Sequence, residues 1–89
     1  MVMFVPGSVV ATRGALAALD RMDVNPTTLI DRHVCGDWGD LGVEDCKANQ
    51  NALTYGARIV SAYVVQQEKF YVITECDRSY TTLMTASEY

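Results

Sequence analysis

The stretch with the clearest chemical character lies between residues 37 and 45. It holds four carboxylates and no lysine or arginine, with a tryptophan and a leucine interleaved. Rows of carboxylates on a rigid scaffold can imitate the phosphates of a nucleic acid, and a partly exposed tryptophan can anchor a protein interface. The pattern therefore predicts a partner-binding surface composed of Asp37, Trp38, Asp40, Glu44 and Asp45.

A structural interpretation of the same stretch stays open. Glu44 and Asp45 would stabilise the N-terminus of a helix through its dipole. Asp37 and Asp40 would cap turns, and Trp38 would fill the core. Under this interpretation the stretch shapes the domain and binds no partner.

The only histidine offers an acid–base alternative. His33 is followed one helical turn later by Asp37, which could orient it as a general base toward Ser61 or Ser79. No strained turn of the GxSxG type accompanies it. A histidine on the apolar side of a helix is more often a buried structural residue, so we predict no catalytic residue and no enzymatic activity.

A second polar group stands between residues 74 and 79. Glu75 and Asp77 could form an acid–base pair, since two nearby carboxylates push their pKa values apart. Asp77 and Ser79 are also turn-forming residues, and Arg78 can pair with an acid or with carbonyl groups at a helix end. We expect a structural turn here.

The three cysteines, Cys35, Cys46 and Cys76, form no CxxC pair and have no histidine at ligand spacing. They suggest neither a disulfide framework nor a zinc site. We therefore expect a reducing cytoplasmic location and neither a metal nor another cofactor.

Composition limits the class of protein. The 89 residues correspond to one domain, and 49% apolar against 20% charged residues is typical of a globular protein. A net charge of −4 argues against direct binding of nucleic acid, because there is no basic surplus to release counterions. No apolar stretch approaches the ~20 residues of a membrane span, and no export signal follows Met1.

The elements that position these residues can be read from periodicity and caps. A short edge strand is predicted at Ser8–Ala11. Three helices should follow, over Arg13–Met22, from Pro26 to about Cys35, and over Val43–Tyr55. The capping residues Thr12 and Asn25 and the glycines at 36 and 56 mark their ends.

The remainder of the chain is rich in β-branched residues. Runs at Arg58–Val65 and Lys69–Cys76 predict a hairpin, and Tyr80–Thr85 predicts a last strand. The first run is apolar on both alternating sets, which favours a central strand. We therefore expect an α+β fold in β-α-α-α-β-β-β order, with an antiparallel sheet packed against helices and the first strand added at one edge.

The chain resembles a family of small plasmid- and phage-associated bacterial proteins with the pattern RHxxGDWGDL…ED…AN…AL…G…SAY…ITEADRSxTT…LLPEEY. Here Cys76 replaces the usual alanine, Cys46 stands where a basic or polar residue is common, and residues 84–89 replace the leucine-proline ending. The matching positions are Arg32-His33, Gly36–Leu41, Glu44-Asp45, Ala48-Asn49, Ala52-Leu53, Gly56, Arg58, Ser61–Tyr63, Ile73–Glu75 and Asp77–Thr82.

Members of this family are often labelled as the M subunit of a type I restriction endonuclease. A DNA methyltransferase needs a glycine-rich cofactor turn and a base-flipping pocket, and the chain has neither the motif nor the length for them. The resemblance implies instead a mobile-element protein. Small acidic proteins of this kind are similar to inhibitors of bacterial defence, including anti-CRISPR proteins that block the DNA-binding surface of an effector complex.

An alternative from another class is a plasmid-maintenance or regulatory accessory protein. It would act as a homodimer through an exposed strand or helix face. The inhibitor would bind a CRISPR–Cas effector complex, whereas the accessory protein would bind products of its own mobile element.

Overall fold

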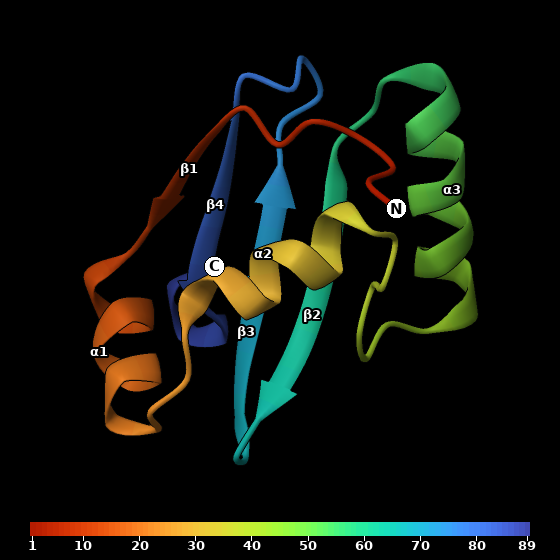
Figure 1. Ribbon diagram of the computed structural model, residues 1–89. Coiled ribbons are helices and arrows are strands. Elements are labelled where there is room, and N and C mark those ends of the chain that lie inside the picture. The colour runs from red at the N-terminus through yellow and green to blue at the C-terminus, as the bar shows by residue number, and fades with distance from the viewer.

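The computed structural model describes residues 1–89 and shows an α+β domain in the predicted order (Figure 1). The elements are β1 (Ser8–Ala11), α1 (Arg13–Arg21), α2 (Pro26–Val34), α3 (Val43–Tyr55), β2 (Ile59–Val65), β3 (Glu68–Thr74), β4 (Tyr80–Thr85) and a short 3₁₀ helix, η1 (Ala86–Glu88). The predicted elements are all present, and their ends differ from the prediction by only one or two residues.

The four strands form one sheet in the order β1-β4-β3-β2. Strands β2, β3 and β4 make the predicted antiparallel meander, and β1 lies at an edge as expected. The prediction of a purely antiparallel sheet is wrong, because β1 runs parallel to β4. The chain returns to β4 through three helices and two further strands, so no hairpin forces β1 to be antiparallel.

Strand β2 occupies the opposite edge of the sheet, so the prediction of a central strand is also wrong. The alternating residues of β2 are apolar on both faces of the strand, because a different part of the domain packs against each face. Ile59 and Tyr63 face the interior, while Ala62 is buried on the other side. The helices and the segment around Trp38 cover these faces, and segment 38–40 occupies the edge where a neighbouring strand would have lain.

The predicted caps define the helix ends. The Thr12 hydroxyl accepts a hydrogen bond of 3.1 Å from the N–H of Ala15, and the Asn25 side chain accepts one of 3.0 Å from Thr27. Gly56, with a φ of +74°, ends α3 in the left-handed conformation that glycine adopts without strain.

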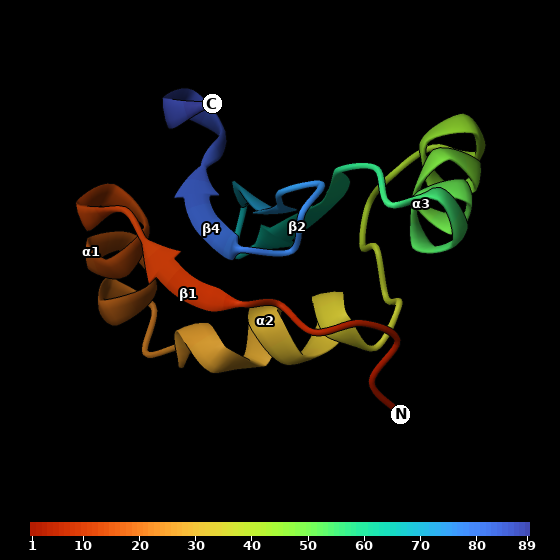
Figure 2. The same ribbon diagram turned by 90° about the horizontal axis from the view of Figure 1, so that it is seen from above.

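Helices α1 and α2 cover one face of the sheet, whereas α3 lies beyond the β2 edge (Figure 2). No helix in the structure is long and apolar enough to cross a membrane. The main core lies under α1 and α2 and consists of Ala15, Ala18, Leu19, Leu29, Tyr63, Phe70, Val72 and Leu83. A second cluster of Trp38, Ala52 and Ile59 joins α3 to the edge of β2.

Candidate functional site

The segment 38–40 lies along the outer edge of β2 and hydrogen-bonds to it. The N–H of Asp40 donates to the carbonyl of Ala62 at 2.7 Å, and the N–H of Ala62 donates to the carbonyl of Trp38 at 3.1 Å. Between them, Gly39 has a φ of +75°, and a β-carbon there would lie 2.0 Å from the Ala62 carbonyl oxygen. Only glycine permits this close approach.

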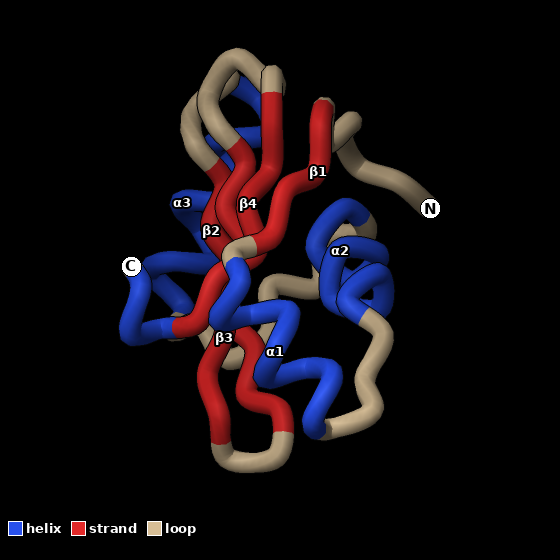
Figure 3. Tube along the Cα trace, turned by 90° about the vertical axis from the view of Figure 1, so that its left-hand side faces the viewer, coloured by secondary structure: helices blue, strands red, loops and turns tan.

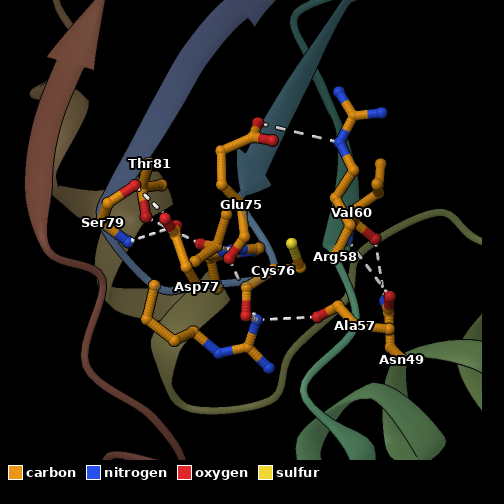
Figure 4. Close-up of polar contacts among 12 residues, drawn as sticks. Asn49, Ala57, Arg58, Val60, Glu75, Cys76, Asp77, Ser79 and Thr81 are labelled. Carbon is orange, nitrogen blue, oxygen red and sulfur yellow. Dashed lines mark hydrogen bonds and ion pairs between the residues drawn. The ribbon is translucent and has the colours of Figure 1, made fainter.

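Two polar side chains extend this cover along β2. The Asp40 carboxylate accepts a hydrogen bond of 3.0 Å from the N–H of Val64. The Asn49 side chain donates to the carbonyl of Val60 at 2.8 Å and accepts from its N–H at 3.1 Å (Figure 4). Outward backbone groups of three alternate residues are thereby bonded, so this edge cannot readily pair with another strand.

Trp38 is 6% exposed and packs against Ala52 and Ile59. Its ring also lies near Phe4 and His33, with ring centroids 6.4 and 6.0 Å away. The prediction of Trp38 as an exposed interface anchor is wrong. An indole buries more apolar surface between α3 and β2 than it would on the surface of the domain, and this favours the buried position.

Asp37 is exposed, but it has an internal partner. Its carboxylate accepts a 2.7 Å hydrogen bond from Arg32 and a 3.1 Å bond from the N–H of Gly39. The Arg32 hydrogen bond is the main reason that the pKa of Asp37 is lowered. The Arg32 guanidinium also lies 4.4 Å from the Tyr63 ring centroid. The charge of Asp37 is therefore largely offset locally.

Glu44 and Asp45 are exposed in the first turn of α3. Gly42 precedes this helix and provides no side-chain cap, so these two carboxylates are the groups that favour its N-terminus electrostatically. Neither forms an ion pair; the three pairs in the structure are Arg21–Glu68, Arg32–Asp37 and Arg58–Glu75. The structural interpretation of Glu44 and Asp45 therefore holds, and both also leave negative charge on the surface.

A groove of about 410 Å³ lies between α3 and the sheet face that no helix covers. Two carboxylates, Asp40 and Asp45, and two cations, Arg58 and Lys69, line it, together with Tyr71 of β3. The Lys69 ammonium lies 5.2 Å from the centroid of the Tyr71 ring, which also packs against Tyr89. The structure thus brings two of the predicted acidic residues to one concave surface.

Tyr71 and Lys69 were missed by the sequence analysis. The alternation of Lys69 and Tyr71 with the buried Phe70 and Val72 places the first pair on the face opposite the core. That signal was present in the sequence. The groove itself was not, because its second wall comes from α3.

His33 lies at the centre of a chain of buried hydroxyl groups. Its Nδ1 is 2.5 Å from the Ser61 Oγ, and its Nε2 is 2.9 Å from the Thr74 Oγ1. Thr74 is in turn 2.7 Å from Thr81, whose hydroxyl donates to the carbonyl of Pro6 at 2.7 Å.

The hydrogen bond from Thr81 to Pro6 fixes the donor and the acceptor of every other bond in this network. Because the Thr81 proton goes to the Pro6 carbonyl, the hydroxyl of Thr74 must donate to Thr81. Thr74 then accepts from His33, so the ring proton lies on Nε2 and Ser61 donates to Nδ1. This network links α2 to β2, β3 and β4 and to the segment before β1.

The arrangement brings His33 and Ser61 together, as the acid–base alternative required, but both are 0% exposed. The predicted orienting residue, Asp37, binds Arg32 instead, and Ser79 bonds to Asp77. Burial lowers the pKa of His33 to about 4, with the nearby charge of Arg78 adding to the effect. The neutral ring thus acts as a structural hydrogen-bonding group in this conformation.

The predicted turn at residues 77–79 is confirmed. The Asp77 carboxylate accepts from both the N–H and the hydroxyl of Ser79, at 3.0 and 2.6 Å (Figure 4). Glu75 pairs with Arg58 at 3.7 Å. Glu75 and Asp77 therefore have separate partners and do not form an acid–base pair.

Arg78 binds helix-end carbonyls, which was one of its two predicted roles. Its guanidinium donates to the carbonyls of Ala52 at the end of α3, of Ala57 and of Glu75, at 3.0, 2.7 and 3.1 Å. It thereby ties the β3–β4 turn to the α3–β2 connection.

All three cysteines are free, and no group of three or more His, Cys, Asp and Glu side chains has a metal-binding arrangement. Comparisons of the chain with models of protein families, with curated proteins and with solved structures gave no match.

Proposed function

We propose that this chain is a non-enzymatic inhibitor, carried by a phage or plasmid, that binds a bacterial defence complex. The first candidate for the target is a CRISPR–Cas effector. The inhibitor would present its carboxylates to the basic surface on which the effector holds DNA, and would thereby compete with the phosphate backbone.

The observation that carries the proposal is the set of unpaired carboxylates around the groove. Asp40 is oriented by its bond to the N–H of Val64, and Asp45 lies across from it on α3. Glu44 adds a third exposed charge in the same helical turn as Asp45. A carboxylate oriented before binding, as Asp40 is, loses little conformational entropy in a complex, which favours affinity.

The contact surface that follows differs from the predicted one. Asp40, Glu44 and Asp45 remain in it, with Tyr71 as the aromatic contact in the groove. Asp37 contributes less because Arg32 offsets its charge, and Trp38 lies inside the domain. The carboxylates of this surface would bind Arg or Lys side chains of a partner, and the groove itself also carries the cations Lys69 and Arg58.

The primary test is phage plaquing on a panel of bacteria with active CRISPR–Cas systems, with and without this chain expressed. Restored plaquing in one strain would support the proposal and identify the target type. If folded protein is expressed and no strain shows restoration, the inhibitor proposal is wrong. Copurification of products of the same mobile element would then favour the accessory role.

The surface is tested by the double variant Asp40→Asn, Asp45→Asn. Asparagine at position 40 can still accept the bond from Val64, so the charge is removed while the local structure remains. We expect several-fold weaker binding to the copurified complex, and weaker wild-type binding at higher salt.

The matched control is Asp31→Asn on α2. Asp31 is also exposed and forms no ion pair, but it lies outside the groove. Equal loss of binding in this control and in the double variant would indicate a general charge effect and would contradict the assigned surface.

A further inference from the structure

The outer edge of β1 has no cover. The N–H of Ser8 donates to the carbonyl of Ser79 and that of Thr12 to the carbonyl of Leu83, so these residues face β4. Backbone groups alternate in direction along a strand, and Val9 and Ala11 therefore point their N–H and C=O groups away from the sheet. In Figure 3 this edge of β1 faces the viewer with no segment across it.

The composition of this edge does not discourage pairing. Residues 1–12 contain no charged side chain, and Val9 and Val10 are each 48% exposed. Natural edge strands usually carry a lysine, a bulge or a covering segment that blocks a second chain. Here only Pro6 stands near the strand, and it lies outside Ser8–Ala11.

We propose that β1 pairs antiparallel with β1 of a second copy, about a two-fold axis at Val10. The two four-stranded sheets would then form one continuous sheet. This inference rests on the backbone geometry of β1 and is independent of the proposed inhibitor function.

The register follows from the free backbone groups. With Val10 opposite Val10 of the second copy, Val9 of each chain faces Ala11 of the other. Both residues of such a pair expose N–H and C=O groups, so each pair exchanges both of its bonds. A register centred on Val9 would place Ala11 opposite Gly7, which lies outside the strand with a φ of +68°. Val10 is therefore the axis that satisfies the whole edge.

The β1 edge is a place where two copies can meet with little charge repulsion. The chain carries a net charge of −4, so two copies repel each other over most approaches. The uncharged residues 1–12 allow like molecules to meet without placing carboxylates together. An isologous two-fold contact also needs a self-complementary surface, and an antiparallel strand pair provides one.

Sedimentation equilibrium of the full chain between about 1 µM and 200 µM tests the proposal, because dimerisation depends on protomer concentration. We expect a monomer at the low end and a dimer at the high end. A wild-type chain that remains monomeric throughout would overturn the proposal.

The axis is tested with Val10→Lys and Val10→Glu. Position 10 is half exposed and its side chain is not needed for the bonds to β4, so both variants should fold, which circular dichroism can verify. Each alone places two like charges next to each other at the axis and should weaken dimerisation about fivefold. An equimolar mixture should dimerise again as the Lys–Glu pair.

Val64→Lys is the matched control, because Val64 is 52% exposed at the covered β2 edge. It should dimerise like the wild type. A Val10→Lys chain that still forms the wild-type dimer, or a mixture that shows no recovery, would contradict the assigned axis.

Discussion

The two edges of the sheet differ in how their backbone groups are bonded. At β2, segment 38–40 and the side chains of Asp40 and Asn49 bond the outward groups of Val60, Ala62 and Val64. At β1, the outward groups of Val9 and Ala11 have no partner within the chain. The difference indicates that the sheet is closed to strand pairing on one side only.

The covered edge of β2 also shows that the acidic segment, residues 37–45, has a structural role. Asp40 both covers the edge of β2 and presents charge to the groove. A residue that orients the chain can therefore also contribute to a binding surface. The structural and the partner-binding interpretations of residues 37–45 are compatible at Asp40 and Asp45, and incompatible at Trp38.

The largest expected effect is that of Gly39→Ala on the covered edge. The new β-carbon would meet the Ala62 carbonyl at 2.0 Å in a left-handed backbone. We expect a loss of about 4 kcal/mol in the free energy of unfolding, or failure to fold. Urea unfolding measures this. As a control, Gly42→Ser has open space and adds a helix cap, and should stabilise by about 0.3 kcal/mol. A mild Gly39→Ala effect would mean that segment 38–40 is not held against β2.

The second largest effect is expected at the hydrogen-bonded network around His33, which reaches from β2 at one edge of the sheet to the segment before β1 at the other. The pKa of His33 is about 4 in the folded state and about 6.5 in an unfolded chain. The unfolded chain therefore binds a proton first, and stability falls as the pH drops from about 6.5 toward 4. The loss is about 1.4 kcal/mol per pH unit, and about 3 kcal/mol in total.

Urea unfolding at pH 7, 6 and 5 tests this dependence above the range in which the carboxylates titrate. His33→Gln should be less stable but should lack this slope. An equal slope in both proteins would show that another group is responsible.

A smaller effect is expected for Asn49→Ala, which leaves the N–H and C=O of Val60 without partners. We expect a loss of about 2 kcal/mol in unfolding free energy, and faster exchange of the Val60 amide hydrogen. Asn51→Ala, on an exposed position of α3, should change stability by less than about 0.5 kcal/mol. Similar losses in the two variants would argue that helix propensity, not edge cover, is being measured.

The smallest effect on stability is expected at the hairpin turn that joins β2 to β3 and fixes the register of the covered edge. Gln66 and Gln67 have φ values of +48° and +74°, which glycine or asparagine adopts more readily. Gln67→Gly should raise stability by about 1 kcal/mol, measured as a higher urea midpoint, without changing the association of β1. A decrease in stability would show that the Gln67 side chain makes a compensating contribution.

The element order and the local turns could be predicted because their signals lie within a few residues. Thr12 and Asn25 begin helices, and Gly56 ends one, through bonds or backbone angles in their own neighbourhood. The turn around Asp77 and Ser79 likewise depends on groups two residues apart. Such contacts form at the same sequence spacing in many folds, which is why spacing alone identified them.

The candidate site was only partly predictable. The acidic residues Asp40, Glu44 and Asp45 were found by composition, while Tyr71 and the groove were missed. The sequence left open whether Trp38 is an interface anchor or fills the core, because its cover comes from residues such as Ala52 and Ile59, which are distant in sequence. The histidine network was also hidden, since Thr74 and Thr81 resemble ordinary strand residues.

The sequence by itself determined the α+β class, the order of elements, the helix caps and an acidic surface. The tertiary structure alone decided that β1 is parallel to β4, that β2 is a covered edge, and that His33 and Ser61 meet inside the core. The physical reason is that these features depend on which distant segments share one sheet edge or face. That choice is made by the packing of the whole domain, because only there are groups such as His33 and Ser61 paired and large side chains shielded from water.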